Sequence, residues 1–286
     1  MNIEIILEKN FPARLREIPT SPKQLYLRGT IPNWDQKFLA VVGARKYTNY
    51  GKEVCEKLIA GLRGNPITIV SGLALGIDSI AHRSALSANL KTIAVPGSGL
   101  GNNVLYPRNH TALAEKIVAS GGALLSEFEP DFRATVWSFP QRNRIMAGLS
   151  HAVLVIEAEE KSGTLITSRL ATEYNRDVLT VPGSIFSSQS AGPHMLIRLG
   201  ATPVRSSKDI LEVLGLKTEE RGIDPLIKYA DCSPEEMKIV ELLTEPRERE
   251  ELIQALQMET SELNAILTLL EIKGLIKETM GEIHLA

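Results

Sequence analysis

Short, almost continuously apolar segments alternate with longer amphipathic segments between residues 38 and 204. The apolar segments are four or five residues long and are typical of parallel strands covered on both faces; they are residues 38–42, 67–70, 92–95, 123–126, 152–156, 178–181 and 201–204. Helical patterns fit between most of them, at residues 50–63, 76–89, 110–120, 141–149, 165–175 and 192–199. This order predicts a doubly wound α/β fold with a mostly parallel sheet, in which ligands bind beyond the carboxyl ends of the strands.

The segments on either side of this core have weaker patterns. Residues 1–37 contain four prolines and little periodicity, which predicts an extended lead-in with one short helix. The core is therefore expected to span residues 38–215. A polar stretch that contains glycine and proline, residues 216–232, is predicted to be a linker.

A compact helical pattern follows the linker. Ser233, Pro234 and Glu236 have the positions of an N-cap, a first helical residue and the third residue of a capping box. Two further helical segments come next, and then a hairpin with its turn at Met280–Gly281. Three helices followed by a hairpin predict a small winged-helix domain over residues 233–286.

The composition is that of an ordinary globular protein, with 43% hydrophobic and 23% charged residues among 286. No apolar stretch reaches the roughly 18–20 residues that a membrane-spanning helix needs, and the N-terminus lacks the pattern of a signal peptide. The two cysteines lie far apart, and the five histidines show no metal-ligand spacing. We therefore expect a cytoplasmic protein without a membrane span, a structural metal or a cofactor.

Charge is distributed unevenly along the chain. Residues 216–286 contain 8 Lys and Arg against 16 Asp and Glu, a net charge of −8. The whole chain has 32 and 34, so residues 1–215 keep 24 and 18, a net charge of +6. A basic part of this kind favours a polyanionic partner, although solvated acidic faces on the C-terminal helices would account for the same numbers.

Three glycine-bearing loops follow predicted strands, at residues 43–51, 71–78 and 96–101. Backbone N–H groups beside glycines and at helix starts can bind phosphate. The candidate positions are Gly43, Ser71, Gly72, Gly97 and Gly99. A dinucleotide site is not supported, because the first loop lacks the G-x-G-x-x-G pattern and the second strand is not followed by an acid. The P-loop motif G-x-x-x-x-G-K-[ST] is also absent from the sequence, so a P-loop NTPase is not supported.

Cationic and hydroxyl side chains lie in or near these loops. The candidates are Arg45, Lys46, Arg142, Asn143, Arg144, Lys161, Ser162, Gly163 and Thr164. The aromatic residue Phe139 is close in sequence to Arg142 and Arg144. Arginine forks and lysine charges match phosphate oxygens, and a ring can stack on a base, so this set is typical of single-stranded nucleic-acid binding. The alternatives are that Arg142 or Arg144 pairs with a nearby glutamate and that Phe139 belongs to the core.

Several stretches together resemble the DNA-processing protein A family, also called DprA or Smf. They are GARKYTNYG, SGLALGIDSIAHRSAL, GSGLGNNVLYPRNH, SEFEP, FPQRNRIMAGLS, VIEAEEKSGTLITSRLATEYNRDVLTVPG and GPHMLIRLGA. The resemblance covers about residues 11–214 and, more weakly, the winged-helix tail. Ala44 departs from the serine that is usual in the family.

The resemblance implies an extended Rossmann-like core that forms homodimers and binds single-stranded DNA without strong sequence preference. It also implies that the protein protects incoming DNA and helps to load the RecA recombinase during natural transformation, and that it is not an enzyme. By similarity, the residues expected to contact phosphate are Arg45, Lys161 and the Ser162–Thr164 turn. Those expected to line the same pocket are Phe139, Arg142 and Asn143, with Ser71 and Gly72 shaping its floor.

Two other functions remain open. The Ser-Gly-Thr turn, with Glu173 on the helix after it, faintly resembles the nucleoside-monophosphate phosphoribohydrolases, which are enzymes. A nucleotide-sensing module without catalysis is the third possibility. In the tail, the helical segment 260–273 has the single cation Lys273 beside Glu262 and Glu271. We therefore expect the tail to bind protein or pack on the core rather than to bind duplex DNA.

Overall fold

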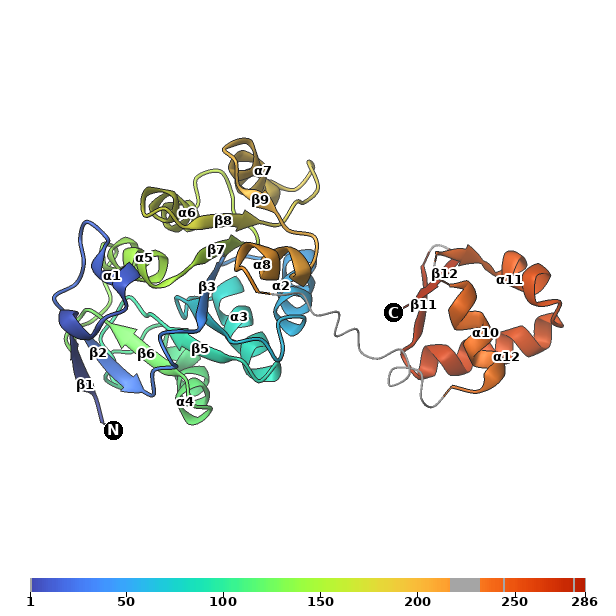
Figure 1. Ribbon diagram of the computed structural model, residues 1–286, viewed down its shortest axis with the longest axis horizontal. Coiled ribbons are helices and arrows are strands. Elements are labelled where there is room, and N and C mark those ends of the chain that lie inside the picture. Colours follow the sequence, from blue (N-terminus) through green and yellow to red (C-terminus); the bar gives the residue numbers. More distant parts are fainter. Residues whose placement is uncertain (1, 217–231, 244, 280, 286) are drawn as a thin grey trace. The chain divides into compact units, whose positions relative to one another are not determined.

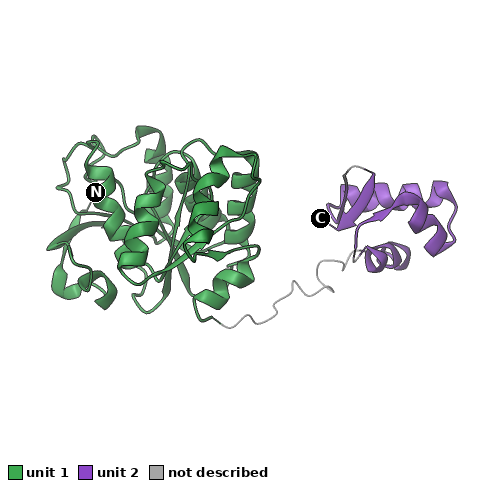
Figure 2. Ribbon diagram, turned by 90° about the horizontal axis from the view of Figure 1, so that it is seen from above, with its two compact units in different colours: residues 1–218 green, residues 219–286 purple. Residues whose placement is uncertain are grey.

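The computed structural model describes residues 2–216, 232–243, 245–279 and 281–285. The chain divides into two compact units, residues 1–218 and 219–286 (Figure 2). Most of the predicted linker, residues 217–231, lies outside the described residues. No helix in the described parts of the chain is both long and apolar enough to cross a membrane.

The first unit contains a nine-stranded sheet in the order β1-β2-β6-β5-β4-β3-β7-β8-β9 (Figure 1). Its strands are β1 (Glu4–Leu7), β2 (Gln24–Gly29), β3 (Lys37–Val42), β4 (Ile67–Ser71), β5 (Lys91–Ala94), β6 (Ala123–Ser126), β7 (Ala152–Val155), β8 (Asp177–Thr180) and β9 (Thr202–Pro203). The strands from β6 to β9 in this order pair in parallel, whereas β1 and β2 form an antiparallel edge. The chain winds outwards from β3 to β6 and then starts again at β7, on the other side of β3. Because the winding reverses there, the carboxyl ends of β3 and β7 form the crevice in which such folds bind ligands.

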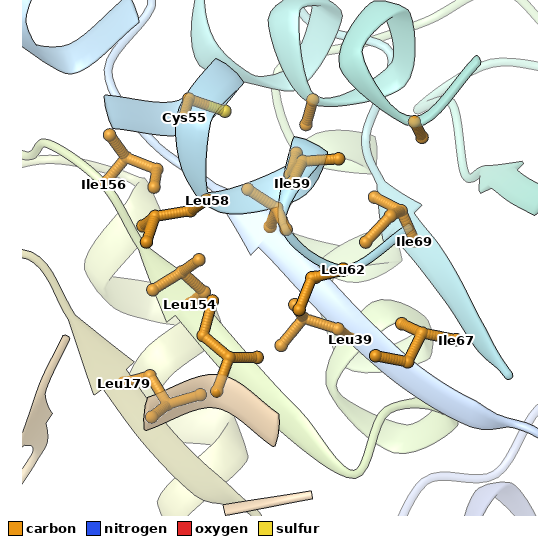
Figure 3. Close-up of a cluster of buried hydrophobic side chains, with 14 of the residues drawn as sticks. Leu39, Cys55, Leu58, Ile59, Leu62, Ile67, Ile69, Leu154, Ile156 and Leu179 are labelled. Carbon is orange, nitrogen blue, oxygen red and sulfur yellow. The ribbon is translucent and has the colours of Figure 1, made fainter. Parts of the chain in front are cut away.

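Helices cover both faces of this sheet (Figure 1). They are α1 (Ala13–Arg16), α2 (Asn49–Ala60), α3 (Ile77–Ser87), α4 (Thr111–Ala119), α5 (Ser138–Leu149), α6 (Thr164–Glu173), α7 (Ala191–Arg198) and α8 (Ser207–Val213), with 3-10 turns at Glu8–Asn10, Arg108–His110 and Ser188–Ser190. In β3, Leu39 and Val41 belong to the buried cluster under α2, α3 and α8, whereas Phe38 and Ala40 belong to the cluster under α1, α5, α6 and α7. Figure 3 shows the first cluster, where side chains of β3, β4 and β7 meet those of α2. Both faces of the strand are buried, which explains its continuous apolar run.

The structure confirms the predicted doubly wound α/β fold with its mostly parallel sheet. All seven predicted strands are present, and their ends lie within one residue of the predicted ends. Residues 1–37 differ from the predicted lead-in, because β1 and β2 join the sheet there in addition to the short helix α1. Leu25 and Leu27 of β2 are buried, and the prolines of this segment lie outside both strands, so they do not interrupt the ladder. The helix α8 was not predicted; it begins with a capping box between Ser206 and Asp209.

In its described residues, the second unit combines three helices with a three-stranded sheet of order β10-β12-β11. Its elements are α10 (Pro234–Leu242), β10 (Arg247–Glu248), α11 (Arg249–Leu256), α12 (Thr260–Ile272), β11 (Ile276–Thr279) and β12 (Glu282–Leu285). This order confirms the predicted winged helix. The predicted capping box is also present, because Glu236 N donates to Ser233 Oγ at 3.2 Å and Ser233 N donates to the Glu236 carboxylate at 2.6 Å. Met280, in the predicted hairpin turn, lies outside the described residues.

Candidate nucleic-acid interface

A cavity of about 480 Å³ opens at the crevice between β3 and β7. The loop after β3, the start of α5 and the loop between β7 and α6 form its walls. The predicted site residues that line it are Gly43, Arg45, Lys46, Phe139, Arg142, Asn143, Ser162, Gly163 and Thr164. The structure therefore brings candidates from three distant stretches of sequence to one cavity at the expected edge of the sheet.

A hydrogen bond joins the loop after β3 directly to the start of α6. Thr164 Oγ1 donates a hydrogen bond to the carbonyl oxygen of Gly43 at 3.1 Å, and Ser162 Oγ accepts one from Thr164 N at 3.2 Å. These residues are at the N-terminus of α6, whose first turn contains no acidic side chain. The partial positive charge of this helix end and its hydroxyl groups therefore face the cavity and suit an anion.

The N-terminus of α2 is closed to a ligand phosphate. The buried carboxylate of Glu157 accepts hydrogen bonds from Thr48 N at 2.9 Å and from Thr48 Oγ1 at 2.5 Å. A β-carbon at Gly51, in the first turn of α2, would collide with this carboxylate. In a dinucleotide-binding fold the pyrophosphate occupies this helix end. Glu157 fills that place here, which accounts for a first loop without the usual glycines.

Arg142 is buried at the back of the cavity and braces the ends of two strands. Its guanidinium donates to the carbonyl oxygen of Gly72 at 2.5 Å, to that of Val95, and to Asn143 Oδ1 at 2.9 Å. It also lies 3.9 Å from the carboxylate of Asp78. Burial raises the pKa of Asp78, and the charge of Arg142 opposes that shift. Arg142 is thus committed to the protein and holds the wall of the cavity in place.

Asp78 completes this brace from the first turn of α3. Its carboxylate accepts hydrogen bonds from Gly72 N at 3.1 Å and Ala74 N at 3.4 Å. A β-carbon at Gly72 would collide with the guanidinium of Arg142. Gly72 therefore allows the close approach between the loop after β4 and α5, and its backbone N–H is already engaged.

Arg45 and Lys46 are the exposed cations of the cavity. Neither has a carboxylate partner within ion-pair distance among the described residues. The guanidinium carbon of Arg45 lies 5.4 Å from the centroid of the half-buried Phe139 ring, which is a cation–π distance. This pair presents a positive charge and an aromatic surface side by side, as a nucleotide phosphate and its base require.

Besides Gly72, three predicted positions support the site without lining this cavity. Ser71 is fully buried and donates to a carbonyl oxygen of β3 at 2.7 Å. A β-carbon at Gly97 would lie 2.6 Å from the Phe139 ring, so this glycine lets the ring approach the loop after β5. Gly99 N donates to the carbonyl oxygen of Phe132 at 2.9 Å, which ties that loop to the segment before α5.

Two predicted cations also lie outside the cavity. The guanidinium of Arg144 is paired with Glu127, which also accepts a hydrogen bond from Gln141 at 2.9 Å. The alternative of a glutamate partner therefore holds for Arg144. Lys161 is exposed in the loop before α6 and borders a neighbouring depression beside α6 and α7.

Sequence reasoning did not assign a site role to several residues around the cavity. Glu159 and Gln189 line it and are linked by a hydrogen bond of 2.9 Å from Gln189 Nε2. Glu157 and Tyr106 were also missed as parts of the site. Glu157 and Glu159 could have been suggested as site residues, although weakly, because both follow the predicted strand at residues 152–156. In contrast, nothing in the sequence places Tyr106 beside Phe139. Among the described residues, no group of three or more His, Cys, Asp and Glu side chains is arranged to hold a metal ion.

Comparison with protein families gives two matches. The family model described as DNA recombination-mediator protein A matches residues 2–215, and the DprA winged helix domain matches residues 225–282. Protein Smf of Synechocystis is 34% identical over an alignment of 310 positions, which covers 96% of this chain and 77% of that protein. DNA processing protein DprA of Streptococcus pneumoniae is 43% identical over 206 residues, 72% of each chain. Protein Smf of Escherichia coli is also 43% identical, and the match spans 54% of its length.

Solved structures agree with this assignment. DNA processing protein A from Streptococcus pneumoniae superposes with a TM-score of 0.69 at 40% identity, over 73% of this chain and 74% of that one. The protein of the same name from Helicobacter pylori, whose structure is described in terms of its single-stranded DNA binding mode, has a TM-score of 0.66 at 31% identity, over 74% and 95%. The fold, the motifs and both family models lead to one conclusion: this chain belongs to the DNA recombination-mediator protein A family.

Proposed function

We propose that this protein is a single-stranded DNA-binding recombination mediator. The observation that carries the proposal is the cavity at the switch point between β3 and β7. There, the exposed cations Arg45 and Lys46 and the N-terminus of α6 surround the ring of Phe139. Charges spaced around an aromatic surface fit a single strand, in which phosphates and unpaired bases are both accessible.

The proposed DNA contacts follow from exposure and hydrogen bonding. Arg45, Lys46 and Lys161 contact phosphates, and the hydroxyl and N–H groups of the turn Ser162–Thr164 add neutral donors. Phe139 stacks on a base. Gly43 and Asn143 line the same cavity, while Arg142 positions its wall rather than binding DNA with a free guanidinium.

The related protein from Helicobacter pylori, which is described as binding single-stranded DNA, supports this assignment through 31% identity and a shared fold. We further propose that the chain acts as a homodimer in the cytoplasm, where it protects incoming single strands and helps to load RecA during natural transformation. Family membership supports these finer proposals, and each needs its own test.

The phosphoribohydrolase alternative is not favoured by the position of Glu173. This acid ends α6, nine residues and about 13 Å from the helix start that faces the cavity. Its exposed carboxylate lies 4.0 Å from Arg169 Nε and does not line the cavity. A catalytic acid has to reach the substrate, so Glu173 is out of place for that role.

For the winged-helix unit we propose a protein contact rather than a duplex-DNA contact. Helix α12 presents the exposed side chains of Leu269 and Ile272, with Glu262 and Glu271 on the same helix. A recognition helix that binds the major groove instead offers cations to phosphates and polar groups to bases.

Fluorescence anisotropy with a labelled 20-nucleotide thymidine strand, and with a blunt duplex of equal length, tests the proposal. We expect the protein to bind the single strand at least tenfold more tightly than the duplex. A companion assay measures how fast RecA assembles on a single strand already covered by a single-strand-binding protein, with and without this chain. Equal affinity for strand and duplex would contradict the binding proposal, and an unchanged RecA assembly rate would contradict the loading role alone.

A further inference from the structure

A second aromatic side chain lies beside the proposed base-stacking residue. The ring centroids of Tyr106 and Phe139 are 5.6 Å apart, with an angle of 55° between the ring planes. Tyr106 is 46% exposed, and Leu75 on the adjacent loop is 47% exposed. With Arg45 and Phe139, these two side chains line a small depression next to the main cavity.

Arg45 and Phe139 belong to both hollows, so they form the wall between them. A strand that places one phosphate on Arg45 and one base on Phe139 in the main cavity therefore has its next nucleotide at the depression. The apolar surface there, from the ring of Tyr106 and the side chain of Leu75, suits the face of an unpaired base.

The backbone of the loop that carries Tyr106 is anchored on both sides of this residue. Leu105 and Pro107 on either side are buried. Tyr106 N donates a hydrogen bond to Ser98 Oγ at 3.1 Å, and Ser98 is itself fully buried. The backbone that carries the ring is thus fixed beside the depression before any ligand arrives, which lowers the entropy cost of binding.

We propose that Tyr106 and Leu75 form a second base-binding subsite, which holds the base of the nucleotide next to the one stacked on Phe139. The inference rests on the proposed single-stranded DNA binding and deepens it. The angle of 55° between the two rings means that the two bases are splayed apart rather than stacked on each other. Stacking of this kind accepts every base, so the subsite adds affinity for single strands without sequence preference.

The test uses the full chain and three tyrosine variants. Loss of one stacked base weakens binding by about 5- to 150-fold, so Tyr106→Ala is expected to weaken binding of the 20-nucleotide thymidine strand within that range. Tyr106→Phe keeps the ring and is expected to stay within about twofold of the unmodified protein. Tyr47→Ala is the matched control, since Tyr47 is 44% exposed and lines neither hollow.

A second strand of equal length, made of abasic deoxyribose phosphate, separates stacking from structural support. The unmodified protein and Tyr106→Ala are expected to bind this strand equally, because it has no base to stack. An equal loss on both strands would overturn the inference, since the ring would then only support the phosphate site. Unchanged binding of the thymidine strand by Tyr106→Ala would overturn it as well, while leaving the proposed function intact. If the unmodified protein bound neither single strand, both the proposed subsite and the proposed single-stranded DNA binding would be contradicted.

Photocrosslinking keeps the inference testable even where Tyr106→Ala is poorly folded. A strand with 5-iodouracil in place of thymine crosslinks on irradiation to aromatic side chains that contact its bases. We expect crosslinks at both Tyr106 and Phe139 in the unmodified protein. Crosslinks at Phe139 without any at Tyr106 would overturn the inference.

Discussion

The buried guanidinium of Arg142 gives the sharpest test of how the cavity is built. Truncation in Arg142→Ala removes the hydrogen bonds to the carbonyl oxygens of Gly72 and Val95 and leaves the buried carboxylate of Asp78 without its cation. Removing one partner of a buried pair costs about 3–5 kcal/mol, because the remaining charge and carbonyl groups stay out of water. The total stability of a domain is about 5–15 kcal/mol, so this is a large fraction of it.

Urea unfolding followed by tryptophan fluorescence measures this loss in the first unit alone. The chain has two tryptophans, Trp34 and Trp137, and both lie in that unit. A loss of about 3–5 kcal/mol corresponds to a fall in melting temperature of about 6–20 °C for a unit of this size. The matched variant is Arg45→Ala, which removes an exposed cation and is expected to change the free energy of unfolding by less than about 1 kcal/mol.

The two arginines are therefore expected to behave in opposite ways. Arg142→Ala loses stability, whereas Arg45→Ala keeps stability and loses affinity for single-stranded DNA. The reasoning would be refuted if Arg142→Ala unfolded within about 1 kcal/mol of the unmodified protein while its affinity fell tenfold or more. In that case Arg142 would act on DNA directly instead of bracing the strand ends.

Three further predictions concern other parts of the first unit. Glu157→Ala is expected to destabilise the unit by about 1–3 kcal/mol in the same urea assay, since Thr48 N and Oγ1 lose their buried acceptor; a change below about 0.5 kcal/mol would argue against that bracing role. Arg144→Ala is expected to change the affinity for single-stranded DNA by no more than about twofold, because the guanidinium is paired with Glu127 outside the cavity. A loss of affinity in the anisotropy assay as large as that of Arg45→Ala would instead show that Arg144 contacts DNA. Burial lowers the pKa of His82 to about 3, whereas the unfolded chain takes up this proton near pH 6.5, so lowering the pH from 7.5 to 5 should destabilise the unit by about 2 kcal/mol through this residue. The variant His82→Gln should lose that share of the pH dependence, and an unchanged difference in unfolding free energy between the two pH values would contradict it.

The periodic part of the fold was readable from the sequence because its strands are buried on both faces. FLAVV, residues 38–42, is apolar at every position since α2 lies over one face and α5 over the other. In contrast, β1 is an edge strand with mostly exposed side chains, and Pro22 and Pro32 lie close to the ends of β2, so the strand pattern of this segment is weak. Their place in the sheet depends on pairing between β2 and β6, about a hundred residues apart in sequence, which local patterns do not encode.

The candidate site was predictable as a set of stretches, but not residue by residue. Strand order alone brings Arg45 and the Ser162–Thr164 turn to one crevice. Sequence could not distinguish the exposed Arg45 from the buried Arg142, because both are arginines in glycine-rich or polar surroundings. Burial and partners separate them, and these depend on how α5 packs against the ends of β4 and β5. Tyr106 was missed because its contact with Phe139 also depends on tertiary packing.

The salt dependence of single-strand affinity tests the central claim most directly. Each neutralised phosphate on a single strand contributes a slope of about −0.7 to the logarithm of the association constant against the logarithm of the salt concentration. The account predicts a slope of about −2 for contacts from Arg45, Lys46 and Lys161, and a slope about 0.7 shallower, with weaker binding, in Arg45→Ala and in Lys161→Ala. A flat salt response of the unmodified protein, or identical slopes and affinities in both variants, would contradict it.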